Sequence, residues 1–93
     1  MGTRFISNKN RLSMYFVYVL KSISHSKTYV GFTNDINRRL KEHNSGKSKF
    51  TSKFAPWEII YKEEYSSQED AIKREKYLKS ATGRRFLKEI IDN

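Results

Sequence analysis

The sequence contains no cysteine, a single proline and no long apolar run. Without cysteine the chain has no disulfide scaffold, no Cys-based zinc site and no thiol nucleophile. Metal binding is therefore left to carboxylates, which suit hard ions such as Mg²⁺ or Mn²⁺. The longest apolar run, Met14 to Leu20, has seven residues, against the roughly 20 that a membrane span needs. The first residues carry no apolar signal region, so we expect a cytoplasmic protein without a membrane association.

The 93 residues suffice for one domain with a small core. Residues 1–13 are polar and basic without a sustained period, and we expect them to form a flexible N-terminal extension. Residues 14–93 then form the domain. The formal net charge of +9 points to a polyanionic partner, because basic groups gain free energy by releasing the counterions of a polyanion.

Three segments have the composition of β-strands. Residues 14–21 are rich in Val, Tyr and Phe and nearly all apolar, which predicts a central strand covered on both faces. Residues 28–33 follow a polar turn and predict a hairpin partner for that strand. Gly31 within this segment marks a bulge or a close backbone approach. Residues 57–65 predict a third strand.

The first helix is predicted to begin after the hairpin and to end at Gly46. Thr33 or Asn34 can cap it, with Asp35 in its first turn. Asn-Ser-Gly is a typical helix end, with Gly46 as the residue that leaves the helix. Residues 47–54 show no period and are predicted to be a basic loop.

Two further helices are predicted to close the chain. Ser66 and Ser67 each precede an acid by three residues, the spacing of a capping box, so the second helix runs from about 67 to 80. Gly83 ends that helix or lets it turn, and residues 84–92 form the third. The order β-β-α-β-α-α indicates an α+β domain with a small, three-stranded, mostly antiparallel sheet flanked by helices.

Basic residues gather in two blocks, 38–53 and 73–88, separated by an acidic stretch. Two basic blocks with interspersed aromatic residues are typical of a groove that follows phosphates, although a solvated helix face is the simpler interpretation. We see no base-reading motif and expect recognition of shape or backbone. The predicted nucleic-acid-binding residues are Arg38, Lys41, Lys47, Lys49, Lys53, Lys79, Arg84 and Arg85.

One acid is out of place. Glu75 is the only acid among residues 73–88 and lies on the apolar face of the predicted helix. A carboxylate there requires a cation, which is either Lys79 at i+4 or a divalent metal. Tyr18 and Tyr29 lie on the two paired strands, and Arg39 follows on the next helix.

This combination resembles the GIY-YIG nuclease superfamily. Phe-Val-Tyr at 16–18 and Tyr-Val-Gly at 29–31 look like its paired signature, and an Arg on the first helix and a Glu on the second follow in the same order. The resemblance covers residues 14 to about 88. It is closest to small single-domain bacterial proteins related to the N-terminal nuclease domain of the excision-repair endonuclease, the nuclease component of excinuclease ABC. The stretches at 42–46 and 74–80 look typical of that subgroup.

The resemblance implies hydrolysis of a DNA phosphodiester with one divalent ion, Mg²⁺ or Mn²⁺. It makes Tyr18 and Tyr29 the active-site tyrosines, Arg39 the phosphate-binding arginine and Glu75 the metal ligand. His43, one helical turn after Arg39, matches a histidine of some restriction enzymes in the superfamily. We expect Tyr29 to act as the general base with Tyr18 and His43 as helpers, although the roles can be exchanged.

Three departures from the family pattern motivate alternatives. Phe16 stands where the signature has Gly, Phe32 stands where the repair nuclease has Lys, and an Asn that usually follows the Glu helix has no clear match. We therefore expect a metal-dependent DNA endonuclease, structure-selective or weakly specific and serving DNA repair. The alternative is a nucleic-acid-binding module of the same fold with weak or lost catalysis, and a third interpretation is a protein-interaction domain that uses the acidic stretch 58–70.

Single residues also have simpler interpretations. Tyr18 and Tyr29 can be ordinary strand aromatics, Arg39 a surface cation, and His43 a residue that favours a helix C-terminus. The expected partner is DNA, with RNA as an open alternative. Because one small domain grips DNA only briefly, a homodimer or a partner protein would supplement the contact.

Overall fold

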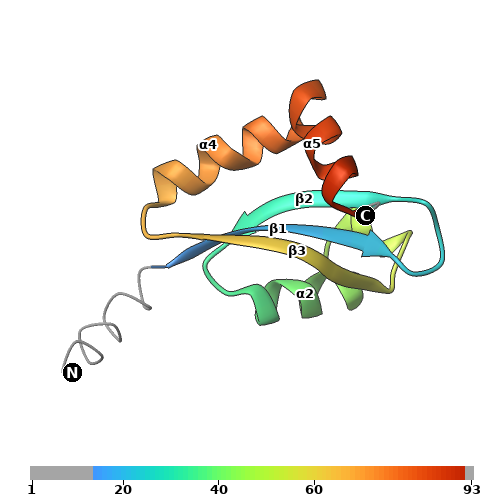
Figure 1. The fold of residues 1–93 in the computed structure, drawn as a ribbon. Helices are drawn as coiled ribbons and strands as arrows, with labels where there is room; N and C mark the ends of the chain where they lie inside the picture. The colour runs from blue at the N-terminus through green and yellow to red at the C-terminus, as the bar shows by residue number, and fades with distance from the viewer. Residues whose placement is uncertain (1–13, 92–93) are drawn as a thin grey trace, which may run out of the picture.

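The computed structural model describes residues 14–91, so the predicted N-terminal extension 1–13 lies outside the described residues. The described residues form a three-stranded sheet and four helices (Figure 1). The strands are β1 (Tyr15–Ser22), β2 (Thr28–Thr33) and β3 (Trp57–Tyr65). The helices are α2 (Ile36–Asn44), α3 (Lys49–Ser52), α4 (Gln68–Lys79) and α5 (Ala81–Ile91). None of these helices combines the length and the apolarity that crossing a membrane requires.

The sheet is antiparallel in the order β2-β1-β3. The prediction that the first strand is central and pairs with the second as a hairpin is therefore confirmed, and so is the α+β class. Tyr18 of β1 lies opposite Gly31 of β2, and Leu20 lies opposite Tyr29. The pairing of β1 with β3 shifts register between Val19 and Leu20.

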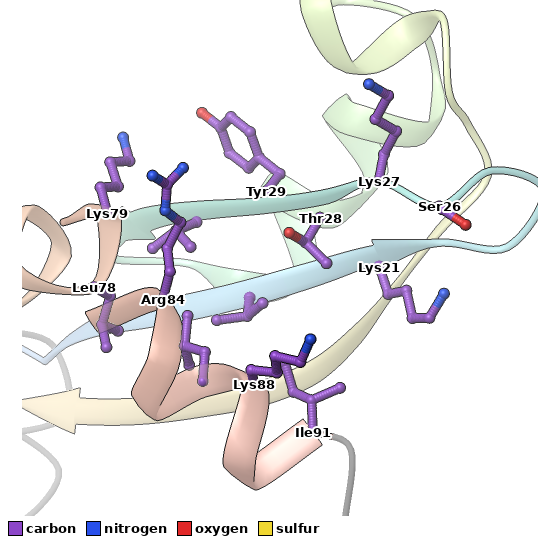
Figure 2. Close-up of a pocket in the computed structure, with 13 residues that line it drawn as sticks. Lys21, Ser26, Lys27, Thr28, Tyr29, Leu78, Lys79, Arg84, Lys88 and Ile91 are labelled. Atoms are coloured by element: carbon purple, nitrogen blue, oxygen red, sulfur yellow. The ribbon is translucent and has the colours of Figure 1, made fainter. Parts of the chain in front are cut away.

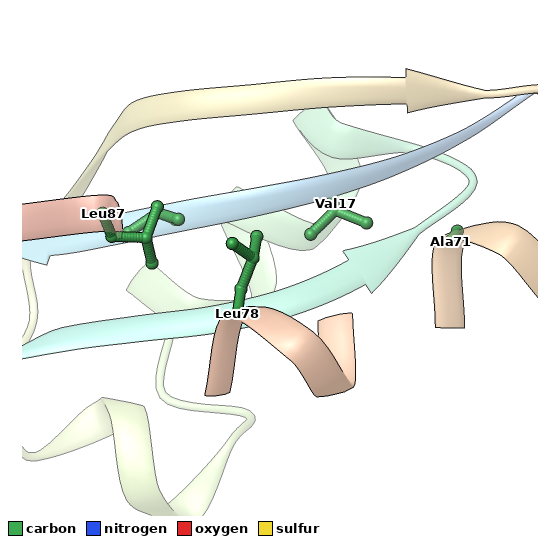
Figure 3. Packing of buried hydrophobic residues seen from close by; sticks show 5 residues of the cluster. Val17, Ala71, Leu78 and Leu87 are labelled. Atoms are coloured by element: carbon green, nitrogen blue, oxygen red, sulfur yellow. The ribbon is translucent and has the colours of Figure 1, made fainter. Parts of the chain in front are cut away.

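Strand β1 supplies both halves of the core. Val17 and Val19 point toward α4 and α5 and pack with Ala71, Leu78 and Leu87 (Figure 3). The alternate residues Tyr18 and Leu20 point to the opposite face, where α2 and α3 lie. Because neighbouring side chains of a strand point to opposite faces, a nearly all-apolar strand has to be covered on both sides, as Figure 1 shows.

The first helix begins one residue later than predicted. Asp35, rather than Thr33 or Asn34, is the N-cap, and its side chain accepts a hydrogen bond from the Arg38 N–H. The Thr33 hydroxyl instead accepts a bond from the Asp35 N–H. The predicted exit at Gly46 is confirmed, with a φ of +88° that favours glycine.

Two segments differ from the prediction. The predicted basic loop contains the single-turn helix α3 (Lys49–Ser52), which is too short to show a period in the sequence. Helix α4 ends at Lys79 with Ser80 as its C-cap, and Gly83 lies inside the first turn of α5 instead of ending the second helix or preceding the third. A Cβ at Gly83 would lie 2.0 Å from the Tyr77 carbonyl oxygen, so this glycine permits close contact between α4 and α5 instead of ending a helix.

Candidate active site

Gly31 allows the Tyr18 side chain to lie flat against β2. Tyr18 is 2% exposed, and a Cβ at position 31 would lie 2.6 Å from its hydroxyl oxygen. The predicted close approach at Gly31 is therefore confirmed, and the approaching group is the Tyr18 phenol. The ring centroids of Tyr18 and Tyr29 are 6.3 Å apart, so the two strands bring both tyrosines to one place.

His43 joins the tyrosines from the α2 side of the sheet. Helix α2 turns Ile36, Leu40 and His43 toward the sheet, and His43 is fully buried. Its Nε2 is 3.0 Å from the Tyr18 hydroxyl oxygen, and its Nδ1 is 2.8 Å from the Thr51 Oγ1. Its ring centroid lies 4.9 Å from that of Tyr29. A chain of hydrogen bonds thus runs from α3 through His43 to β1.

Helix α3 is fixed so that Thr51 reaches His43. The Trp57 indole N–H donates to the Thr51 carbonyl at 2.7 Å, and Thr51 is fully buried. The Asn44 side chain accepts from the Trp57 N–H at 2.7 Å and donates to its carbonyl at 3.2 Å. These bonds connect the end of α2, the turn of α3 and the start of β3 into one support for the histidine.

The neutral ring of His43 joins two buried hydroxyl groups. Burial, followed by the Arg39 guanidinium, lowers the pKa of His43 to about 4, so at neutral pH the ring has one N–H donor and one acceptor. If the Thr51 hydroxyl donates to Nδ1, then the Nε2–H donates to the Tyr18 oxygen. In the opposite tautomer the Nδ1–H donates to the Thr51 oxygen and the Tyr18 hydroxyl donates to Nε2, so the ring connects the two hydroxyls in either form.

The Arg39 guanidinium and the Glu75 carboxylate also affect the pKa of Tyr18. Burial raises the pKa of Tyr18 to about 12, Tyr29 adds to the rise, Arg39 opposes it and Glu75 raises it further. Tyr18 is therefore protonated at neutral pH. The same interactions place the guanidinium and the carboxylate within electrostatic reach of one phenol, and direct contacts join Tyr18, Tyr29 and His43.

Arg39 is hydrogen-bonded to Glu42, but this bond uses only part of the donor capacity of its guanidinium. Its Nη1 donates to Glu42 Oε1 at 2.8 Å, while a guanidinium has five N–H donors. Arg39 and Glu42 line a hollow of about 400 Å³ together with Tyr15 and Asn34. The remaining donors are therefore available to a phosphate that enters from this side.

Glu75 meets a cation, as its place on the apolar face required. Its side chain is 16% exposed, and its Oε2 lies 3.0 Å from the Lys79 Nζ. Lys79 in turn lies 5.9 Å from the Tyr29 ring centroid. The predicted i+4 pair is thus present, and it places a lysine between the carboxylate and the tyrosine.

The donor set fits a hard divalent ion with one protein ligand. Within residues 14–91 no three His, Cys, Asp or Glu side chains cluster closely enough to form a metal cage. Mg²⁺ commonly keeps several waters and is bound by one or two carboxylates together with substrate phosphate oxygens. Glu75 supplies one such carboxylate at the edge of the sheet, and the ion would replace Lys79 as its cation.

A groove of about 850 Å³ opens beside β2 next to the tyrosines. Figure 2 shows Tyr29, Lys79 and Arg84 extending past β2 in the same direction. Of the eight predicted nucleic-acid-binding residues, Lys79 and Arg84 line this groove. Arg38 lies in the hollow beside Arg39 and is 3.6 Å from Glu42. The others lie outside the groove, namely Lys41, Lys47, Lys49, Lys53 and Arg85.

Two sets of residues at the site carried little signal in the sequence. Lys21, Lys27 and Lys88 also line the groove; the first two flank a turn that is far in sequence from α5, so only the tertiary fold brings them to Lys88. Thr51 was missed because it lies in the segment that the sequence presented as a loop. A polar residue beside Phe50 and Phe54 was its only signal.

Comparisons with known proteins agree with this geometry. The family model described as GIY-YIG catalytic domain matches residues 14–88. A UPF0213 protein of Staphylococcus epidermidis is 36% identical over 80 residues, which are 85% of this chain and 96% of that protein. The UPF0213 protein YazA of Bacillus subtilis is 41% identical over 69 residues, which are 73% of this chain and 69% of YazA.

A solved structure is also similar. The solution NMR structure of a UPF0213 protein from Bacillus halodurans superposes with a TM-score of 0.51 at 30% identity, covering 83% of this chain and 84% of that chain. The sheet order, the two tyrosines on its paired strands and the extent of the family match lead to one conclusion. This chain belongs to the GIY-YIG family, whose domain has a nuclease-type fold.

Proposed function

We propose that this protein is a metal-dependent DNA endonuclease that hydrolyses phosphodiester bonds with structure-selective or weak sequence specificity. The observation that carries the proposal is the convergence of two tyrosines, a buried histidine, an arginine and a carboxylate beside a basic groove. DNA repair in the cytoplasm is the proposed setting, because the resemblance is to a repair nuclease.

Each side chain has a task that its surroundings suit. Arg39 binds the scissile phosphate with the donors that Glu42 leaves unused and offsets charge that builds there. Glu75 would hold Mg²⁺ or Mn²⁺, and that ion would supply Lewis-acid polarisation of the phosphate when bound. Lys79, once released from Glu75, is a second cation for the substrate.

The two tyrosines differ in exposure, and we assign them different roles for that reason. Tyr29 is half-buried and lines the groove, so its hydroxyl is accessible to water and substrate, and we assign it as the general base. Tyr18 is almost fully buried and bound to His43, so we assign it a positioning role. The neutral His43 is hydrogen-bonded to the Tyr18 hydroxyl through Nε2 and keeps the phenol directed toward the site.

Cleavage assays with Glu75→Gln test the proposal. Branched, nicked and linear DNA are incubated with Mg²⁺ and with Mn²⁺. We expect the wild type to cut at least one substrate and Glu75→Gln to lose about 10²-fold or more of that activity, the scale on which electrostatic groups contribute. Glu69→Gln is the matched control on the same helix, because Glu69 is exposed and pairs only with the exposed Lys73. Absence of cutting by the wild type, or equal cutting by Glu75→Gln, refutes the proposal.

A nucleic-acid-binding module with weak or lost catalysis is the second candidate. Phe32, in the position where the repair nuclease has a lysine, favours it. It predicts DNA binding that weakens steeply with salt and is unaffected by Glu75→Gln, with no cleavage in either metal. Binding that does not respond to salt excludes this candidate.

A further inference from the structure

The groove beside β2 is lined by cations from three separate segments. Lys21 and Lys27 come from the β1–β2 hairpin, Lys79 from α4, and Arg84 and Lys88 from α5, and the groove lining contains no acidic residue (Figure 2). Like charges brought together raise the local positive potential, and such an arrangement is stable only because water and counterions screen it. A bound polyanion would do the same more effectively.

Within residues 14–91, most of these cations have no carboxylate partner. Within the described part of the chain, Lys79 is the only one of the five in a salt bridge. On the opposite side of β2, by contrast, Arg38 and Arg39 share Glu42. The unpaired positive charge of this region is therefore concentrated along the groove.

The floor of the groove is apolar. Val30 and Ile91 are partly exposed and form the floor, and the buried core residues Val19 and Leu78 lie beneath them. A surface with cations along the rim and hydrocarbon below fits a ligand that presents anionic groups outward and carbon-rich groups inward. A sugar–phosphate backbone has both, since its phosphates are anionic and its deoxyriboses are largely apolar.

We propose that this groove binds the backbone of the DNA segment next to the scissile phosphate, so that the substrate runs from the tyrosines along β2 and α5. The inference rests on the proposed function for the identity of the ligand. Tyr29 and Lys79 belong both to the site and to the groove, so a strand that leaves the site enters the groove without a gap. The basic side chains of the segment around α3 then contribute less to DNA binding than the groove does.

Salt-dependent DNA binding tests the groove without any cleavage step. Fluorescence anisotropy with a fluorescein-labelled branched DNA is measured in EDTA from about 50 to about 200 mM salt, the range over which such contacts weaken. The groove variant is Lys27→Gln/Lys88→Gln. The control is Lys62→Gln/Lys76→Gln, which removes the same charge at two exposed lysines outside the groove. Thermal unfolding of each variant checks the fold.

We expect the groove variant to bind more weakly and to reduce the slope of log affinity against log salt by about 2, roughly one for each phosphate that a lysine no longer neutralises. The control should keep the wild-type slope. Equal changes in both variants, which indicate net charge alone, or no change in either, overturn the groove.

The two proposals can fail separately. If the wild type binds DNA through the groove but cuts no substrate with Mg²⁺ or Mn²⁺, the endonuclease proposal fails and the groove stands. If the wild type cuts DNA and Lys27→Gln/Lys88→Gln cuts with the same dependence on DNA concentration, the groove fails and the endonuclease proposal stands.

Discussion

Two tyrosines, one arginine and one glutamate meet twice in this fold, once beside β3 and once beside β2. The β3 cluster consists of Tyr61, Glu63, Tyr65 and Arg74. The β2 cluster consists of Tyr18, Tyr29, Arg39 and Glu75, joined by His43. The two sets contain the same four side chains of three types, so their difference lies in how the groups are paired.

The β3 cluster is saturated. Arg74 donates from Nε and Nη2 to the two oxygens of Glu63 at 2.8 and 3.0 Å, and both tyrosine hydroxyls donate to the same carboxylate. Four hydrogen bonds fill the acceptor capacity of a carboxylate. Burial alone would raise the pKa of Glu63, but Arg74 and the tyrosines outweigh it and lower that pKa. Nothing remains for a ligand.

The β2 cluster is divided among other partners. Arg39 is paired with Glu42 and Glu75 with Lys79, while Tyr18 is bound to a neutral histidine. Each pair uses part of the capacity of its members, and Arg39 lines the hollow whereas Tyr29 and Lys79 line the groove. Residue types alone therefore do not distinguish the two clusters, whereas incomplete pairing does.

The largest expected difference between the two clusters is how their contribution to the free energy of unfolding responds to acidic pH. The pKa of His43 is about 4 in the fold against about 6.5 in the unfolded chain. Between these values the unfolded state binds more protons, so the free energy of unfolding falls as pH drops from about 6.5 to 4. Each pH unit costs about 1.4 kcal/mol, which amounts to about 3 kcal/mol over the window. Glu63, with its lowered pKa, loses its contribution only below its usual value of 4.5.

Urea unfolding at several pH values measures this loss. His43→Gln should flatten the profile between about pH 6.5 and 4.5, whatever its effect on stability at neutral pH. His25→Gln is the matched control, since His25 is an exposed turn residue, and it should keep the wild-type profile. A wild-type curve that stays flat down to about pH 4.5 contradicts the assignment.

The equivalent carboxamide substitution in each cluster should separate stability from chemistry. Glu63→Gln leaves the half-buried Arg74 without its charged partner, and we expect a loss of about 2 kcal/mol, or roughly 8–16 °C in Tm. Cleavage well below the transition should be unchanged. Glu75→Gln should do the reverse, because Glu75 makes one bond to a half-exposed lysine.

Calorimetry and cleavage assays on both variants check this double dissociation. If Glu63→Gln abolishes cleavage while the protein remains folded, the β3 cluster belongs to the site and the contrast between the clusters fails. If Glu75→Gln lowers Tm as much as Glu63→Gln, Glu75 has a structural role.

Most elements of the fold could be predicted because the sequence patterns that indicate them are local. The central strand was recognised from one apolar run. Gly31 marked a position where a larger residue would have no space, and Gly46 marked a backbone conformation that a larger residue rarely adopts. The short helix α3 was not predicted, since four residues cannot show a helical period. The first cap was misassigned because Thr33, Asn34 and Asp35 are all capping residues, and only the geometry selects Asp35.

The candidate site residues were proposed one by one from the sequence, whereas most of the hydrogen bonds and ion pairs between them were not predicted. Tyr18 and His43 are 25 positions apart, and Lys27 and Lys88 are farther still. Pairings over such distances depend on the packing of α2, α3 and α5 against the sheet. Tyr61, Glu63 and Tyr65 alternate along β3, but their connection to Arg74 appears only once the strand and α4 are placed together.

The smallest expected effect concerns the support of the β2 cluster. Thr51→Val keeps the shape of the side chain but removes the hydroxyl that bonds to His43 Nδ1, so we expect a loss of about 1 kcal/mol in stability. Because the Nδ1 of His43 then loses the partner that holds the ring in place, cleavage should fall roughly fivefold and its pH profile should shift. Thr51→Ser restores the hydroxyl without the methyl group and should recover both the rate and the profile. If Thr51→Ser is as impaired as Thr51→Val, the methyl packing is what matters, and the hydrogen-bond chain from α3 to Tyr18 has no part in the chemistry.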